Sequence, residues 1–270
     1  MNIDSLLNQV KRLHFIGIGG SGMCPLAEIM RAEGYELSGS DNSVSDTLER
    51  IKGYGIPVFS EHKPENIDGA EMVVYTAAAK QDNPELVEAR KHGIPTVERS
   101  VFLGAVTRRY KRSVAISGTH GKTSTTAMLS QVLIGAGFDP SAIIGGKLPY
   151  IGGNSYVGQS NIILCEACEY VDTFLQLNPA ISVIINIEAD HLDYFKDLAD
   201  VQKSFHKFAE LATFGVIANG DDEHTVQAME GIDYVSFGLG DHNRIHAANM
   251  CPDWRHFDVI CDGEFYCHLD

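Results

Sequence analysis

One stretch decides the fold of this chain: Ser113-Val-Ala-Ile-Ser-Gly-Thr-His-Gly-Lys-Thr-Ser-Thr-Thr126. The apolar and small residues at 114–117 predict a buried strand, and apolar or small residues recur at helical spacing over 122–135. A glycine turn ending in Gly-Lys-Thr joins the two. In such a strand–turn–helix unit, backbone N–H groups and the helix N-terminus face a bound phosphate. The stretch therefore predicts a nucleotide-binding loop in an α/β protein.

Two side chains of this loop have expected roles. Lys122 is placed to reach the β/γ-phosphates, and the Thr123 hydroxyl is placed to contact Mg²⁺. The pattern is shorter than the full phosphate-loop motif, because Ile116 stands where the motif has its first glycine. The alternative is a chance Gly-Lys-Thr triplet. The strand before it and the helix after it favour the phosphate loop.

A second glycine turn lies near the start of the chain. Gly17, Gly19 and Gly22 follow a short apolar strand and precede a helix, and residues 35–41 form a further strand that ends in Asp41. This is the pattern of a dinucleotide-binding βαβ unit, in which the turn holds a diphosphate and the acid lies near a ribose. The alternative is a tight turn that only lets the helix pack on the strand.

Strands continue to alternate with helices through residue 107, which predicts a mostly parallel sheet with helices on both faces. Ligands bind beyond the carboxyl ends of such strands, so the first glycine turn, Ser40-Asp41 and residues 76–80 are expected to converge on one crevice. The basic stretch Arg108–Arg112 is interpreted as a junction. The predicted domains are residues 1–107 and 113–270, with 108–112 as the linker.

Two apolar strands after the phosphate loop end in acids. Residues 161–165 lead to Glu166 and Glu169, and residues 181–187 lead to Glu188, Asp190 and His191. Acids at strand ends beside a phosphate loop are where the metal of a nucleotide is held. The alternative for each carboxylate is a solvated strand end. Cys165 and Cys168 have no second pair for zinc and are interpreted as small packed thiols.

Composition and charge restrict the class of protein. The 270 residues carry a formal net charge of −15, which argues against nucleic acid as the main partner. No apolar run approaches the roughly 18 residues that span a bilayer, and Met1–Arg12 lack a signal-peptide core. Six cysteines without paired spacing suggest free thiols in a reducing compartment. We expect a cytoplasmic protein with no membrane partner.

The motifs as a set resemble the Mur ligases of peptidoglycan synthesis. They are His14-Phe-Ile-Gly-Ile-Gly-Gly-Ser-Gly-Met23, Gly118-Thr-His-Gly-Lys-Thr123, Gly153-Asn154 and Asn186-Ile-Glu-Ala-Asp-His191. The resemblance covers about residues 11–222. It implies a Rossmann-like, parallel-sheet N-terminal domain that holds a UDP-sugar, followed by a P-loop α/β central domain that binds ATP. It also implies Mg²⁺ as a cofactor and UDP-N-acetylmuramate and L-alanine as substrates, joined through an acyl phosphate.

The resemblance assigns roles residue by residue. Lys122, Glu166 and His191 resemble catalytic residues, and Thr123, Glu166 and His191 resemble the metal site. The residues assigned to ATP are Gly118, Thr119, His120, Gly121, Lys122, Thr123 and Ser124. The residues assigned to the UDP-sugar are Gly17, Gly19, Gly20, Ser21, Gly22, Met23, Ser40, Asp41, Thr76 and Asn154, the last lying near the muramoyl group.

The sequence departs from the family in two places. Where many relatives have Glu-Ala-Asp-Glu, this chain has Glu166-Ala-Cys-Glu169, so one acid is replaced by Cys168. The family pattern also continues beyond residue 270, so we expect a truncated, N-terminal fragment that does not complete the ligation alone. Three alternatives remain: a ligase that adds a recycled tripeptide to the same acceptor, a UDP-sugar-binding module without catalysis, and an NAD-dependent dehydrogenase. The dehydrogenase leaves the Gly-Lys-Thr loop without a role.

Overall fold

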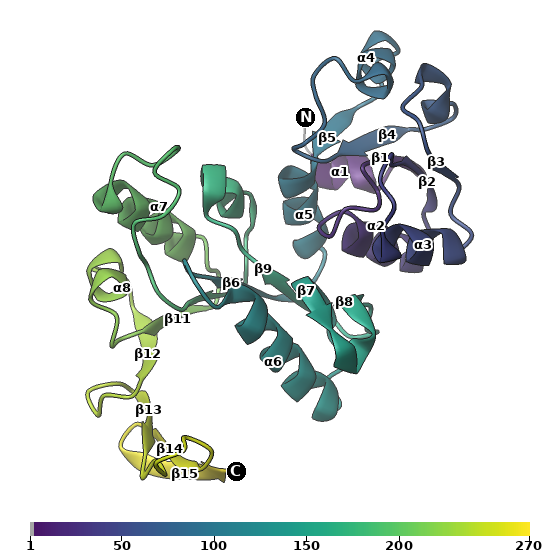
Figure 1. Ribbon diagram of the computed structural model, residues 1–270. Helices are drawn as coiled ribbons and strands as arrows, with labels where there is room; N and C mark the ends of the chain where they lie inside the picture. The colour runs from purple at the N-terminus through teal and green to yellow at the C-terminus, as the bar shows by residue number, and fades with distance from the viewer. Residues whose placement is uncertain (1–2) are drawn as a thin grey trace. The chain divides into compact units, whose positions relative to one another are not determined.

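The computed structural model describes residues 3–270. The chain divides into two compact units, one formed by the residues up to 111 together with 127–164, and the other by 112–126 together with 165–270. Figure 1 labels the helices and strands and colours them along the chain. Each unit is described by itself. The domain boundaries expected from the sequence, with a linker at 108–112, stay a prediction.

The first unit contains a five-stranded parallel sheet in the order β3-β2-β1-β4-β5. Its strands are β1 (Arg12–Ile16), β2 (Glu36–Ser40), β3 (Val58–Phe59), β4 (Met72–Tyr75) and β5 (Thr96–Glu98). Its helices are α1 (Ile3–Leu7), α2 (Cys24–Ala32), α3 (Asp46–Gly53), α4 (Pro84–Lys91) and α5 (Arg99–Thr107), with a 3-10 turn η1 (Pro64–Ile67). In Figure 1, α2, α3 and α5 lie on one side of the strands and α4 on the other. The predicted parallel sheet with helices on both faces is confirmed.

Local sequence explains where these helices begin. Ser45 caps α3 by accepting a hydrogen bond from the Leu48 N–H, and Asn83 caps α4 with Pro84 at the first helical position. In the centre of the sheet, β1 is buried on both sides. Phe15 on this strand packs edge to face against Phe102 of α5 at a centroid distance of 5.7 Å. The strand thereby fixes the start of the first glycine turn.

The first unit also includes a hairpin formed by β7 (Ser141–Leu148) and β8 (Gly153–Tyr156), which are joined by the 3-10 turn η2 (Pro149–Ile151). The strands pair antiparallel, with a register shift between Ile143 and Leu148. The glycine-rich stretch 143–158 supplies most of this hairpin, which places Asn154 on β8.

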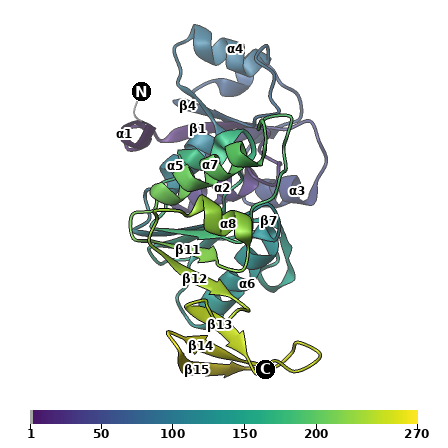
Figure 2. The same ribbon diagram turned by 90° about the vertical axis from the view of Figure 1, so that its left-hand side faces the viewer.

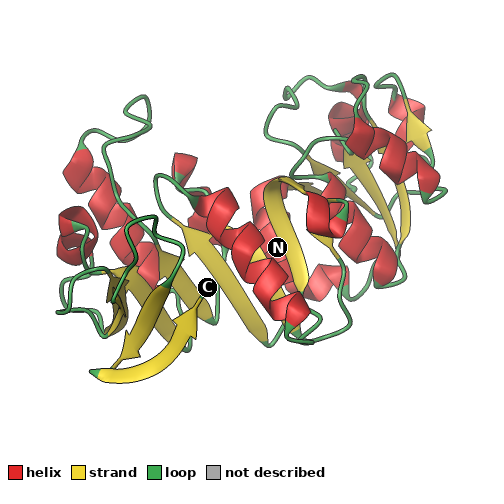
Figure 3. Cartoon of the chain, turned by 60° about the horizontal axis from the view of Figure 1, so that its bottom comes forward, coloured by secondary structure: helices red, strands yellow, loops and turns green. Residues whose placement is uncertain are grey.

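The second unit contains a sheet whose strands follow the order β15-β14-β13-β12-β11-β10-β6. These strands are β6 (Arg112–Ser117), β10 (Ile181–Ile184), β11 (Gly215–Asn219), β12 (Tyr234–Gly238), β13 (Ile245–Ala248), β14 (Phe257–Cys261) and β15 (Glu264–Leu269). Strands β6, β10, β11, β12 and β13 pair in parallel, whereas β13 with β14 and β14 with β15 pair antiparallel. Figures 2 and 3 show these last strands as a small meander at the carboxyl-terminal end of the chain.

The other elements of the second unit are η3 (Tyr170–Gln176), α7 (Leu198–Glu210) and α8 (Glu223–Ala228). Helix α6 (Lys122–Gly135) and strand β9 (Ile162–Glu166) each have residues in both units. Three buried phenylalanines join η3 to α7, with Phe174 stacked on Phe208 at 4.6 Å and edge-on to Phe205 at 5.3 Å. This packing fixes the segment that follows β9. Within residues 3–270, no helix combines the length and the apolar character needed to cross a membrane.

Candidate nucleotide-binding sites

The phosphate loop follows β6 as the sequence predicts, and α6 begins at Lys122. Gly118 and Gly121 adopt φ angles of +147° and +85°, in the region that side chains disfavour. A Cβ at Gly118 would lie only 3.2 Å from the backbone nitrogen of Asn186. Backbone conformation therefore favours glycine at both positions, and the close approach of the segment around Asn186 adds a steric reason at Gly118.

Asn186, which follows β10, holds this loop in place. Its backbone oxygen accepts a hydrogen bond from the Thr119 N–H at 3.0 Å, and its side-chain oxygen accepts one from the His120 N–H at 2.8 Å. The Asn186 amide also donates to the His120 carbonyl at 3.1 Å. The Thr119 hydroxyl in turn accepts from the Glu188 N–H at 2.8 Å. The loop is thus ordered by contacts within the second unit.

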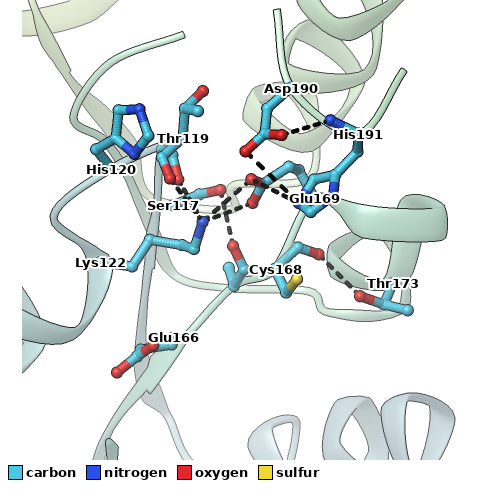
Figure 4. A network of polar contacts seen from close by, with 12 residues as sticks. Ser117, Thr119, His120, Lys122, Glu166, Cys168, Glu169, Thr173, Asp190 and His191 are labelled. Carbon is cyan, nitrogen blue, oxygen red and sulfur yellow. Dashed lines mark hydrogen bonds and ion pairs between the residues drawn. The ribbon is translucent and has the colours of Figure 1, made fainter. Parts of the chain in front are cut away.

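The ammonium of Lys122 lies against a buried carboxylate (Figure 4). Lys122 Nζ is 2.9 and 3.1 Å from the two Glu169 oxygens and donates to the carbonyls of Gly118 at 2.6 Å and Thr119 at 3.3 Å. The Glu169 side chain is only 2% exposed, and that of Lys122 is 18% exposed. An acid this deeply buried needs a partner, and Lys122 supplies it.

The three predicted metal ligands do not all lie together: Thr123 contacts Glu166, whereas His191 lies beside Glu169. The Thr123 hydroxyl donates to Glu166 Oε2 at 3.0 Å, at the first turn of α6. His191 instead lies near Glu169, with Nε2 3.7 Å from Oε1, and its ring packs on Tyr170 at a centroid distance of 4.6 Å. Among residues 3–270, Glu166, Glu169 and His191 do not form a group whose ligand atoms all lie within 4.8 Å of one another.

This donor set suits Mg²⁺. A hydroxyl and a carboxylate oxygen are hard ligands, and Mg²⁺ in nucleotide sites takes one or two protein carboxylates together with phosphate oxygens and water. Thr123 and Glu166 provide such a pair on the phosphate-loop helix. His191 has a positive φ of 55°, and its ring lies beside Glu169. The residues present therefore fit a magnesium–nucleotide complex.

Glu169 and Asn186 are the residues of this site that the sequence analysis did not assign. Glu169 was noted among the acids at strand ends that could hold a metal but was left out of the residue-by-residue assignment; its position inside the Glu-Ala-Cys-Glu motif was the available signal. Cys168 does not disturb the pair, because only its carbonyl is used, accepting from the Thr173 hydroxyl and the Phe174 N–H. Cys165 is packed as expected, whereas the expectation of packing is wrong for Cys168, which is exposed.

In the first unit, the glycine turn after β1 is held by Asp41. This carboxylate accepts from the Gly19 N–H at 2.8 Å and from the Ser43 N–H at 2.9 Å, and it is 8% exposed. Gly17 has a φ of +80°, and a Cβ there would lie 2.7 Å from Thr76 Cγ2. Asp41 and Thr76 therefore do converge on this turn. Its exposed part is Gly20-Ser21, and Met23 is buried beneath it.

Ser40 is fully buried, and its hydroxyl points away from the turn. It donates to Glu85 at 2.7 Å and meets His62 Nδ1 at 3.0 Å. Burial raises the pKa of the Glu85 carboxyl, but hydrogen bonds from His14, Asn66 and Ser40 outweigh burial and lower the pKa to about 2. The Ser40 carbonyl accepts from Gly17 N at 2.7 Å. Ser40 thus supports the turn from below.

Asn154 connects β8 to the glycine turn within the first unit. Its amide donates to the Ser21 carbonyl at 2.7 Å, and its oxygen accepts from Arg50 at 2.8 Å. Arg50 is also paired with the buried Glu28 at 2.7 Å. Asn154 is only 3% exposed. The structure therefore places this residue beside the turn, as expected, with its side chain already engaged by protein groups.

The comparisons with known proteins agree with this geometry. Residues 12–111 match the Mur ligase family, catalytic domain, and residues 116–267 match the Mur ligase middle domain. The chain belongs to the Mur ligase family. The resemblance on which the sequence analysis relied is thus confirmed, as is the mixed α/β fold with a parallel first sheet.

Individual relatives are named as follows. A UDP-N-acetylmuramate–L-alanine ligase of Acetivibrio thermocellus is 44% identical over 265 residues, which is 95% of this chain and 56% of that relative. The solved UDP-N-acetylmuramate–alanine ligase of Thermotoga maritima matches with a TM-score of 0.80 at 28% identity, over 96% of this chain and 60% of that one. A solved UDP-N-acetylmuramate:L-alanyl-γ-D-glutamyl-meso-diaminopimelate ligase from Neisseria meningitides matches with a TM-score of 0.85 at 27% identity. It is covered over 86% of its chain. The chain spans somewhat more than half the length of the curated relatives it matches.

Proposed function

We propose that this chain carries the UDP-sugar and ATP sites of a ligase that joins L-alanine to the muramoyl carboxylate of UDP-N-acetylmuramate through an acyl phosphate. One observation carries the proposal: the Thr123–Glu166 pair and the Lys122–Glu169 pair stand together at the start of α6, in a loop of the Gly-Lys-Thr type. The match to the alanine ligase at 44% identity supports the choice of substrate. A cytoplasmic location belongs to the same proposal.

Each proposed role follows from a contact. When ATP binds, the Lys122 ammonium would exchange its contacts with Glu169 for contacts with the γ-phosphate. Its hydrogen bond to the Gly118 carbonyl of the loop would keep the side chain in position. The backbone N–H groups at 121–124, where α6 begins, would bind the remaining phosphate oxygens, because those of Thr119 and His120 donate to Asn186. Because phosphoryl transfer depends mainly on positioning and on charge neutralisation, these groups are those the reaction requires.

Thr123, Glu166 and His191 would hold Mg²⁺ with ATP. When bound, the ion supplies positive charge to the phosphate oxygens during transfer. Glu169 lies between His191 and Lys122. We propose that it orients both, which makes it a positioning residue for the nucleotide site.

In the first unit, the UDP-sugar would bind over the exposed Gly20-Ser21 part of the turn. The backbone of this turn is shaped by Asp41 and Thr76, and its rim is formed by Asn154. Since Ser40 and Asp41 are buried and engaged, we propose that they act through the shape of the turn. The diphosphate would be bound mainly by backbone N–H groups.

The test is calorimetric titration of the 270-residue chain with UDP-N-acetylmuramate, with the Mg²⁺ complex of a non-hydrolysable ATP analogue, and with NADH. We expect saturable binding of the first two and no response to NADH. Lys122→Met and Glu166→Gln should weaken the ATP analogue at least tenfold and leave the UDP-sugar unchanged, whereas Lys52→Met, on the exposed face of α3, should change neither. Binding of NADH alone would refute the proposal. Turnover by the chain alone at an ordinary rate would contradict our expectation that it does not complete the ligation.

A second candidate is the tripeptide-adding ligase, favoured by the TM-score of 0.85 to the Neisseria structure. Both candidates share the acceptor and ATP, so the binding test does not separate them. A ligation assay on a protein that contains this chain and carries the full activity separates them, with L-alanine and the tripeptide offered in competition. We expect L-alanine to be used.

A further inference from the structure

The hairpin formed by β14 and β15 carries two histidines and two aspartates on one face. Asp258 pairs directly with His268 in the antiparallel register, and the next pair outward is Phe257 with Leu269. Just beyond that pair, His256 and Asp270 contact each other through their side chains. Because side chains alternate along a strand, residues two apart on each strand project to the same side. The four side chains therefore form a square of alternating acid and imidazole groups.

The distances within this square are short. Asp270 Oδ1 lies 3.0 Å from His256 Nδ1 and 3.1 Å from His268 Nε2. The planes of the two imidazole rings are nearly parallel, with an angle of 4° between them and centroids 6.4 Å apart. Among residues 3–270, His256, His268 and Asp270 form the one group of three or more such side chains whose ligand atoms all lie within 4.8 Å of one another.

We propose that His256, His268 and Asp270 form a binding site for a divalent transition-metal ion of the Zn²⁺ class. The donor atoms are His256 Nδ1, His268 Nε2 and an Asp270 carboxylate oxygen. Ligands about 2.0–2.1 Å from one ion lie about 2.8–3.0 Å from one another in adjacent octahedral positions and about 3.3–3.4 Å in tetrahedral ones. The N–O separations of 3.0 and 3.1 Å fall between these two values.

Asp258 prepares one of these ligands. Its Oδ1 is 2.6 Å from His268 Nδ1, so the ring donates its Nδ1 hydrogen to the carboxylate and directs Nε2 toward Asp270. A carboxylate–histidine–metal arrangement of this kind fixes the ring and raises its basicity as a ligand. Asp258 is the least exposed of the four, at 19% for its side chain. It is therefore a positioning residue for the proposed site.

The chemistry of the site differs from that of the nucleotide site. Two imidazole nitrogens favour Zn²⁺, Co²⁺ or Ni²⁺, whereas Mg²⁺ prefers oxygen ligands. An ion here would also join the start of β14 to the end of β15. Strand β14 also pairs with β13, whereas β15 pairs only with β14 among the described strands, so this link would hold the edge strand of the sheet in place. The proposed role is structural, with the remaining coordination positions open to water because the ligands are exposed.

The test is titration of the metal-stripped 270-residue chain with Zn²⁺ at pH 7.5 in a non-coordinating buffer, in the presence of excess Mg²⁺. We expect one Zn²⁺ to bind with an affinity that His268→Gln and His256→Gln each weaken at least tenfold, and that Asp258→Asn weakens by about tenfold. The matched control is His92→Gln, which removes an equally exposed imidazole paired with Glu88 and should leave the affinity unchanged. Co²⁺ substitution should give a visible absorption band that His268→Gln removes.

Circular dichroism identifies any variant that fails to fold. If one histidine variant fails to fold, the Zn²⁺ affinity of the other histidine variant tests the proposal. Two results would overturn the proposal: no Zn²⁺ bound by the wild-type chain, or equal Zn²⁺ affinity in the wild type and both histidine variants. In either case the square would be a set of cross-strand ion pairs between protonated imidazoles and carboxylates. Displacement of Zn²⁺ by millimolar Mg²⁺ would also contradict the assigned class of ion.

Discussion

Removal of the Lys122 charge should destabilise the second unit through Glu169. The Glu169 carboxylate is 2% exposed and takes two contacts from Lys122 Nζ, while His191 Nε2 is 3.7 Å away. Lys122→Met keeps most of the side-chain volume but leaves a buried carboxylate without its main partner. Breaking a buried ion pair from one side costs about 3–5 kcal/mol, and the partial exposure of Lys122 places this case near about 3 kcal/mol.

The opposite change should cost much less. Glu169→Gln retains an oxygen that accepts from Lys122, and the ammonium still has the carbonyls of Gly118 and Thr119 and some contact with solvent. We expect a cost of about 1 kcal/mol. In the double variant no charge is left unpaired. Its cost should therefore fall below the sum of the two single costs by at least about 1.5 kcal/mol.

The assay is thermal unfolding followed by circular dichroism and by the fluorescence of the single tryptophan, Trp254, which belongs to the second unit. About 3 kcal/mol corresponds to a fall in melting temperature of roughly 6–12 °C for a unit of this size. The control cycle uses Lys52 and Glu49, whose side chains are 46% and 63% exposed and pair across one helical turn. That pair should contribute less than about 0.5 kcal/mol.

The reasoning is refuted if Lys122→Met lowers the melting temperature no more than Lys52→Met does. It is also refuted if the costs of the two single changes simply add in the double variant, because independent costs would mean that Glu169 does not depend on Lys122.

Three further predictions concern other parts of the chain. The pKa of the Glu85 carboxyl is lowered from 4.5 to about 2, so this group stabilises the first unit above pH 4.5 and loses the effect as pH falls toward 2. In Glu85→Gln the melting temperature of the first unit should therefore change less with pH between 4.5 and 2 than in the wild type. Gly17→Ala should cost at least about 1 kcal/mol more than Gly34→Ala, because both have positive φ but only Gly17 faces Thr76 at 2.7 Å; equal melting temperatures would contradict this. Burial raises the pKa of Cys165 to about 12, so a thiol reagent at pH 8 should modify the exposed Cys168 and spare Cys165, as mass spectrometry of native protein and of Cys168→Ser can verify.

The local elements could be predicted from the sequence because their signals are local. The helix expected at 122–135 has these bounds in the structure, and the β-strands around both glycine turns lie within one or two residues of the expected positions. Helix α8 and the turn η3 were not predicted. In η3, Val171 and Asp172 adopt positive φ angles, and no glycine marks this conformation in the sequence.

The contacts between side chains were the part that the sequence could not supply. Spacing placed Thr123, Glu166 and His191 at the ends of elements that face one region, but it could not show that His191 lies with Glu169 and not with Glu166. That choice depends on the left-handed conformation at His191 and on the Tyr170 ring beneath it. Both come from packing between segments about twenty residues apart, and a motif does not encode them.

The same limit explains why acids were harder to interpret than glycines. A glycine with positive φ leaves a mark in the sequence because few other residues tolerate that conformation. A buried acid leaves none until its partner is known: the sequence gives no sign that Glu85 and Glu28 are buried, and it marks Glu169 only as one of several acids at strand ends. Each proves to be buried beside a cation or hydrogen-bond donor from a distant segment. In this chain the acids that look least specific in the sequence are therefore those that depend most on a partner, so removing the partner, as in Lys122→Met, should cost more than removing the acid.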